Sequence, residues 1–126
     1  MKRILLCLMV ALFATGCLFA KNNDEKMNVM SYNIRYDNSG DKDNQWKFRR
    51  DFAADLVNFH EADVFGAQEV LNNQLNDLLD RLPEYAYVGV GREDGKTKGE
   101  YTPIFYRKDR FSVEKSGNFW LAEDIN

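Results

Sequence analysis

The sequence predicts a mixed α/β domain in which two helices pack on a sheet that contains parallel strands. Short apolar runs alternate with two segments whose apolar residues recur every three or four positions, which gives the order strand, helix, strand, helix and then three strands. The segment 37–62 is long enough for the crossover that parallel neighbours need. Aromatic residues make up 13% of the chain, which favours a globular fold over a disordered one.

Residues 1–20 have the layout of an export signal. Lys2 and Arg3 precede the apolar run Ile4–Ala14, which is shorter than the about 20 residues of a membrane span. Two processing positions stay open: a lipoprotein signal ending at Cys17, which would attach the lipidated chain to a membrane, or cleavage after Ala20. We therefore expect an exported protein that is periplasmic, anchored to the outer membrane or secreted.

After a polar tether, residues 21–26, the domain is expected over residues 27–126. Without Lys2 and Arg3, 15 of the 17 basic residues remain against 20 acidic ones, a net charge of −5. Such a body is a poor general binder of polyanions, so the sequence carries no strong nucleic-acid signal and predicts no protein partner. No cysteine follows Cys17, which excludes a disulfide or a thiolate metal site in this body.

The first half of the domain reads as strand, loop, helix and strand. Residues 27–36 form the first predicted strand, and the turn-forming residues 37–45 form a loop. A helix begins at Trp46, with apolar residues at three- and four-residue spacing. These residues are Phe48, Phe52, Leu56 and Phe59. Residues 63–67 are the second strand.

The second half reads as a helix followed by three strands. The helix carries a core-packing leucine stripe that Pro83 closes. This stripe is Leu71, Leu75, Leu78, Leu79 and Leu82. Three strand-like runs follow, at residues 85–91, 101–107 and 110–120. Since Pro103 cannot donate a ladder hydrogen bond, its strand is expected at an edge of the sheet or bulged.

Polar side chains follow the two strands predicted to be parallel. Asn33 and Glu69 lie near the carboxyl ends of these strands, where open sheets tend to bind ligands. A glutamate there suits magnesium, which takes one or two carboxylates together with phosphate oxygens; the alternative is a strand that simply ends in water. Two residues apart on a strand, Asn33 and Arg35 point to one side, and both can donate to phosphate. Their alternatives are a strand-capping amide and a solvated charge.

Three segments, MSYNIRY, ADVFGAQEV and YAYVGVGREDGKTKGEYTPIFYR, resemble the endonuclease/exonuclease/phosphatase superfamily of deoxyribonuclease I-like, metal-dependent phosphoesterases. The resemblance covers nearly all of the chain after the leader and corresponds to the N-terminal half of the fold. It implies half of a four-layer α/β sandwich. It also implies hydrolysis of phosphodiester or phosphomonoester bonds with magnesium or manganese.

The resemblance also implies roles for individual residues. Glu69 would be the catalytic metal ligand, Asn33 would help to hold the scissile phosphate, and Gln68 would support Glu69. The residues expected to contact substrate are Arg35, Glu100 and Tyr101 by resemblance, and Arg92 because its loop can face an anion.

The departures from the superfamily pattern argue against activity in this chain alone. The family chemistry also needs a histidine at the phosphate, an aspartate–asparagine pair and an aspartate–histidine pair, all beyond Asn126. His60, the single histidine, is expected at a helix end or on the surface. Where the nuclease branch has an arginine, this chain has Leu71, and this difference argues against a nucleic-acid substrate. We expect little hydrolysis; the alternatives are a non-catalytic surface lipoprotein or binding module, or a fragmentary gene.

Overall fold

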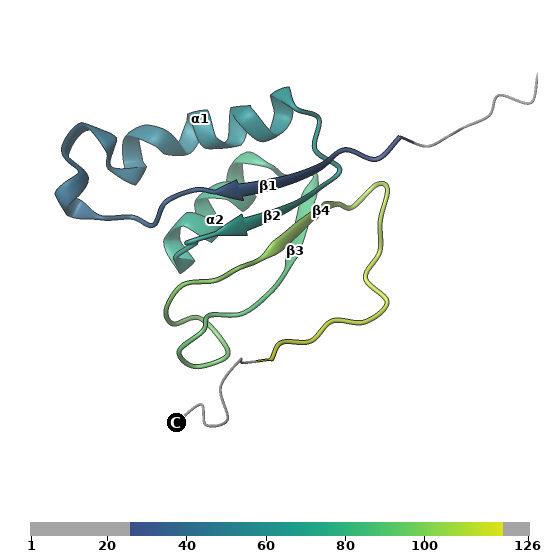
Figure 1. Ribbon diagram of the computed structural model, residues 1–126. Coiled ribbons are helices and arrows are strands. Elements are labelled where there is room, and N and C mark those ends of the chain that lie inside the picture. The colour runs from purple at the N-terminus through teal and green to yellow at the C-terminus, as the bar shows by residue number, and fades with distance from the viewer. Residues whose placement is uncertain (1–25, 120–126) are drawn as a thin grey trace, which may run out of the picture.

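The computed structural model describes residues 26–119, and one mixed sheet forms its centre (Figure 1). The strands are β1 (Val29–Asn33), β2 (Val64–Gln68), β3 (Tyr85–Val88) and β4 (Ile104–Arg107), in the order β1-β2-β4-β3. Strands β1 and β2 are parallel, whereas β4 is antiparallel to both β2 and β3. This confirms the mixed α/β class. The predicted signal, Cys17 and residues 21–25 of the tether lie outside the described residues.

Two helices, α1 (Trp46–Phe59) and α2 (Asn72–Arg81), pack on the sheet, and a 3₁₀ helix, η1 (Ser39–Asn44), precedes α1 (Figure 1). Alternation along β2 sends Phe65 and Ala67 into the core, while Gly66 and Gln68 lie on the other face and are only partly covered. Phe65 stacks on Phe105 with ring centroids 4.5 Å apart. Within residues 26–119, the helices are too short or too polar to cross a bilayer.

The leucine stripe of α2 packs as predicted, but α1 is rotated away from its expected orientation. Leu75, Leu78 and Leu82 are buried. In α1, by contrast, the buried side chains are Trp46, Ala53, Ala54 and Val57. The two alanines permit close packing, and the indole Nε1 of Trp46 donates to Asp77 Oδ2 of α2 at 2.7 Å, which fixes the rotation. The phenylalanines of α1 therefore face outward.

The first predicted strand is shorter than expected. It ends at Asn33, because the Oδ1 of Asn33 accepts the backbone N–H of Arg35 at 2.8 Å and Arg35 adopts a φ of 57°. A residue in this left-handed region cannot continue a strand.

Of the two alternatives expected for Pro103, the edge position is wrong, since β4 is an inner strand. Pro103 precedes β4, where no ladder donor is required, and its carbonyl accepts the N–H of Ala67 at 2.9 Å. Residues 110–119 contain no strand. After β4 the chain turns, with the N–H groups of Arg110 and Phe111 both donating to the carbonyl of Arg107, and Arg110 pairs with the buried Asp63.

Candidate active site

The carboxyl ends of β1 and β2 bring an amide and a carboxylate into contact. The register pairs Asn33 with Gln68, so Glu69 follows directly beside the end of β1. The Nδ2 of Asn33 donates to Glu69 Oε1 at 2.9 Å, and the backbone N–H of Tyr36 donates to Glu69 Oε2 at 3.2 Å. Glu69 has a φ of 58°, which takes it out of the ladder at this point. The parallel strands thus produce the expected meeting of Asn33 and Glu69; the catalytic roles of both residues remain predictions.

These contacts favour the charged form of Glu69. The hydrogen bond from Asn33 lowers the pKa of Glu69 below its ordinary value of 4.5, with further lowering from the Tyr36 N–H and the charge of Arg35. At neutral pH the group is therefore an ionised carboxylate, and each oxygen has acceptor capacity beyond its one donor.

This donor set fits a hard divalent cation that keeps most of its water. Among residues 26–119, no cluster of three or more His, Cys, Asp and Glu side chains could hold a metal. Magnesium nevertheless needs only one or two carboxylates when waters and substrate phosphate complete its coordination. Glu69 can supply one such ligand.

Arg35 does not lie beside Asn33 on a strand, as the two-residue spacing suggested. Its guanidinium forms a bidentate pair with Asp41 of η1, Nε to Oδ2 and Nη2 to Oδ1, both at 2.6 Å. This hydrogen-bonded pairing lowers the pKa of Asp41. Arg35 is still 55% exposed, so its predicted contact with substrate would require a rearrangement of this pair or binding at its open side.

Gln68 donates to β1 and β2 rather than to Glu69. Its Nε2 donates to the carbonyl of Gly66 at 3.0 Å and to the Oγ of Ser31 at 3.3 Å. Any support for Glu69 is therefore indirect, through the end of the ladder that Gln68 shares with Asn33.

Tyr101, one of the predicted substrate contacts, is buried. Its side chain is 1% exposed, and its hydroxyl donates to Asn72 Oδ1 at 3.0 Å. In this conformation the ring lies in the core, so the predicted contact of Tyr101 with substrate would require the ring to become exposed.

Arg92 and Glu100 remain at the surface of the loop that joins β3 to β4. Arg92 Nη1 lies 3.3 Å from Glu100 Oε2, and the Arg92 backbone N–H donates to the Glu100 carbonyl at 3.1 Å. Both side chains line a cavity of about 150 Å³ with Val90 and Thr102. Their contact with a substrate stays a prediction.

Two supporting residues escaped sequence reasoning. Gln74 is fully buried; its Oε1 accepts the N–H groups of Asp37 and Leu71, and its Nε2 donates to the carbonyl of Arg35. Arg49 donates to the carbonyls of Ile34, Arg35 and Asn44. Together they hold the segment that presents the Tyr36 N–H to Glu69. A glutamine among the leucines of α2 could have indicated the buried role of Gln74. No feature of the sequence indicated the role of Arg49.

Solved structures share this fold. An endonuclease/exonuclease/phosphatase from Bacteroides vulgatus is 53% identical, with a TM-score of 0.73 over 76% of this chain and 37% of that chain. A mannosyl-6-phosphatase from Bacteroides thetaiotaomicron is 45% identical, with a TM-score of 0.76 over 78% of this chain and 38% of that one. This chain is thus similar to a part of endonuclease/exonuclease/phosphatase family proteins. A second family member from B. thetaiotaomicron is 45% identical, with a TM-score of 0.75, and matches 77% of this chain and 36% of its own length.

The match covers only part of these family members. The chain spans less than two-fifths of the length of the solved structures named above. An uncharacterized protein of Acanthamoeba polyphaga mimivirus is 27% identical over 124 residues, which is 84% of this chain and 18% of that protein. No protein-family profile matches the sequence. The family relationship thus supports a phosphoesterase type of protein, in a superfamily that is generally metal-dependent.

Proposed function

We propose that the carboxyl ends of β1 and β2 bind magnesium through Glu69 as part of a phosphoesterase site. The observation that carries this proposal is the Asn33–Glu69 hydrogen bond, which holds an ionised carboxylate at a sheet edge in a chain similar to a part of phosphoesterase-family proteins. Manganese, which prefers the same oxygen ligands, is the expected substitute.

At this site, one residue would bind the cation and another would bind the substrate. A bound divalent cation would offset charge on phosphoryl oxygens, the usual contribution of a metal to this chemistry. Glu69 would hold the cation. The amide of Asn33 has two hydrogens; one is directed at Glu69, and the second can be donated to a phosphate oxygen.

For this chain alone we propose binding with little turnover. The described residues contain a single histidine, His60, and it lies at the C-terminal end of α1, near the start of β1 and away from Glu69. Loss of an acid or base typically costs 10²–10⁴-fold in rate for each proton-transfer role. A binding module without catalysis is therefore the second candidate, favoured because residues 26–119 contain no group of three or more His, Cys, Asp and Glu side chains that could hold a metal.

The proposed substrate class is a phosphate ester of a sugar. The support is the solved mannosyl-6-phosphatase that is 45% identical to this chain. The acidic body of the protein and Leu71 point in the same direction, because neither favours a polyanionic nucleic acid.

Calorimetric titration of the full chain with magnesium chloride tests the cation site. Glu69→Gln removes the charge while keeping the size, and Glu61→Gln is a matched control at an exposed glutamate near the start of β2. We expect binding by the wild type and by Glu61→Gln, and none by Glu69→Gln. Equal binding by all three proteins would refute the site.

Phosphate release from mannose 6-phosphate tests the second part. We expect release close to the uncatalysed rate in the presence of magnesium. Rapid, magnesium-dependent release that Glu69→Gln abolishes would overturn the proposed inactivity while supporting the cation site.

We also propose that the protein is exported and carries a lipid on Cys17. The support is the apolar run Ile4–Ala14 between a basic start and the cysteine. Labelled palmitate should enter the wild-type chain and not Cys17→Ser in cells. Incorporation into neither protein would favour cleavage after Ala20.

A further inference from the structure

The outer face of α1 carries three exposed phenylalanines, here named the phenylalanine stripe. Phe48 is 63% exposed, Phe52 is 66% exposed and Phe59 is 79% exposed. Their separations of four and seven residues place them on one side of the helix, since an α-helix repeats every 3.6 residues. The stripe therefore runs along nearly the whole of α1.

The size of the stripe narrows the choice of partner. An aromatic side chain buries about 200 Å² when it is fully covered. The exposed surface of the three phenylalanines is therefore on the order of 400 Å². Patches of this size on a soluble protein commonly mark an interaction site. A stable dimer needs about 800 Å² from each partner, so the stripe alone is too small for a second copy of the chain.

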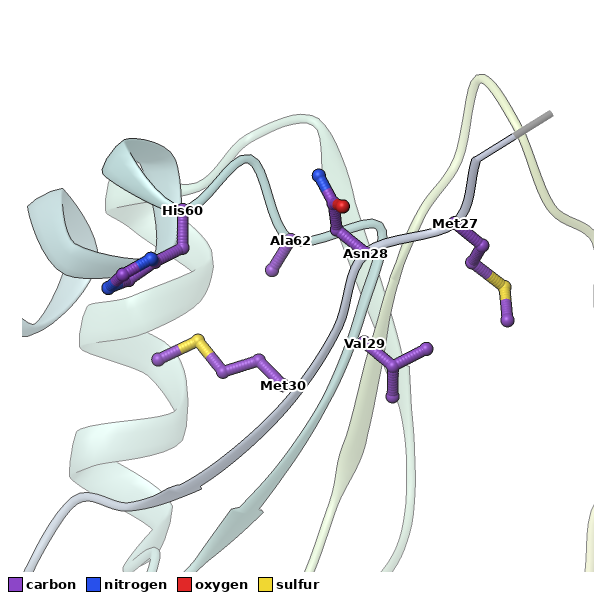
Figure 2. Close-up of a pocket in the computed structure, with 6 residues that line it drawn as sticks. All are labelled: Met27, Asn28, Val29, Met30, His60 and Ala62. Carbon is purple, nitrogen blue, oxygen red and sulfur yellow. The ribbon is translucent and has the colours of Figure 1, made fainter. Parts of the chain in front are cut away.

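The stripe continues toward the start of the described chain. The ring of Phe59 meets the ring of His60 edge-on, with centroids 5.2 Å apart. His60 in turn lines a cavity of about 470 Å³ with Met27, Val29 and Met30 (Figure 2). Figure 2 shows the side chain of Met30 directed toward His60, with Met27 and Val29 on the other side of the strand. The cavity thus extends from the end of α1 to the start of β1.

Charges around the stripe do not favour an anionic partner. The Nζ of Lys47 lies 4.8 Å from the centroid of the Phe48 ring, and Asp51 pairs with Arg81. Asp55 and Glu61 are exposed on the same helix and just after it. With no basic excess along this face, any membrane attraction must come from apolar area rather than from anionic headgroups.

We propose that the phenylalanine stripe docks on a zwitterionic lipid bilayer. The argument for this partner is the chain that precedes the described residues, which contains the apolar run Ile4–Ala14 and Cys17. The ten residues from Cys17 to Met27 reach at most about 35 Å when extended. A chain attached at Cys17 would therefore keep the end of α1 close to the bilayer, where phenylalanines insert at the headgroup boundary.

Vesicle flotation of the full chain tests the docking. Wild type is compared with a stripe variant, Phe48→Ser/Phe52→Ser/Phe59→Ser. The matched control, Ile104→Ser/Val113→Ser/Phe119→Ser, loses three other exposed apolar side chains that lie away from α1. All three proteins share the same N-terminal residues, so the contribution of that segment cancels. Far-ultraviolet circular dichroism establishes that each protein is folded.

On phosphatidylcholine vesicles the stripe variant should bind roughly tenfold or more weakly than wild type, because binding scales with the apolar area inserted. The control variant should differ from wild type by less than about twofold, and neither added phosphatidylserine nor added salt should strengthen wild-type binding. Equal binding by the stripe variant and wild type would overturn the proposal, whatever the outcome of the magnesium titration.

A nitroxide on Phe52→Cys, in a Cys7→Ser/Cys17→Ser background, keeps the proposal testable if the triple variant does not fold. Vesicles should raise the exposure of the label to oxygen and lower its exposure to a water-soluble relaxing agent. Spin–spin broadening that depends on protein concentration without vesicles would show a second copy on the stripe. A label already shielded in the vesicle-free monomer would show coverage by the chain itself. Either result would overturn lipid docking.

Discussion

Gln74→Ala should destabilise the domain and loosen the candidate site together. Gln74 is fully buried, and its side chain accepts the Asp37 N–H at 3.0 Å and the Leu71 N–H at 3.1 Å. It also donates to the carbonyl of Arg35 at 2.9 Å. Alanine removes all three partners at once, on both sides of the loop that places the Tyr36 N–H against Glu69.

The expected loss follows from the number of groups left without a partner. Each buried group that loses its hydrogen bond costs about 1–3 kcal/mol, which gives about 3–9 kcal/mol for three groups. Arg35 and Asp37 lie near the surface, so water can replace part of the loss there. We therefore expect a decrease of about 3–4 kcal/mol in the free energy of unfolding, a large fraction of the about 5–15 kcal/mol of a typical domain.

Urea denaturation of the full chain measures this change, and two variants control it. Gln74→Met keeps most of the side-chain volume without the hydrogen bonds and should lose nearly as much. Asn76→Ala, at an exposed position of the same helix, should stay within about 0.5 kcal/mol of wild type. If Gln74→Met is as stable as wild type, the hydrogen bonds do not carry the effect. Magnesium should also bind more weakly to Gln74→Met, through the loosened Tyr36–Glu69 contact.

Three other substitutions test the site, the far end of the sheet and the core. Asn33→Ala should raise the pKa of Glu69 toward 4.5, so the stability that the lowered pKa contributes above this value becomes smaller and its loss on acidification is complete at a higher pH; an unchanged midpoint in a carboxyl NMR titration would contradict this. Asp63 Oδ2 accepts the backbone N–H of Asn28 at 2.8 Å, and Asp63→Asn should weaken this hydrogen bond. The free energy of unfolding, measured by urea denaturation at neutral pH, should fall by about 1–3 kcal/mol. That difference should shrink as the pH falls through the lowered pKa of Asp63, and a constant difference would contradict it. Phe65→Ala should cost about 3–5 kcal/mol by the same measurement, and a loss below about 1 kcal/mol would show that the core collapses around the cavity.

The sequence predicts the parts of this fold that depend on spacing along the chain. The crossover length was enough to predict parallel β1 and β2, and that pairing brings Asn33 to Glu69. The leucines of α2 leave only one apolar face, so its orientation was also predictable. In each case the local sequence pattern is compatible with only one structural arrangement.

The rotation of α1 could not be predicted in this way, because the helix carries two stripes with the same period. One contains phenylalanines and the other contains Trp46, Ala53, Ala54 and Val57. Hydrophobicity favours the first, but the close approach to α2 and the bond from Trp46 to Asp77 select the second. The contacts of Gln74 and Arg49 were equally hidden, since they join residues up to 39 positions apart.

The location of the site residues separates cation binding from catalysis. Asn33 and Glu69 come from adjacent strands, and the loop that supplies the Tyr36 N–H is held by Gln74 and Arg49, all within one compact unit. A carboxylate held in this way needs no other part of the family fold to stay ionised and in place. Proton transfer, by contrast, needs an acid or base at the phosphate, which neither Asn33 nor an ionised Glu69 engaged with a cation can supply. Magnesium binding can therefore occur without hydrolysis in this chain, and the titration can succeed where the phosphate assay shows no turnover.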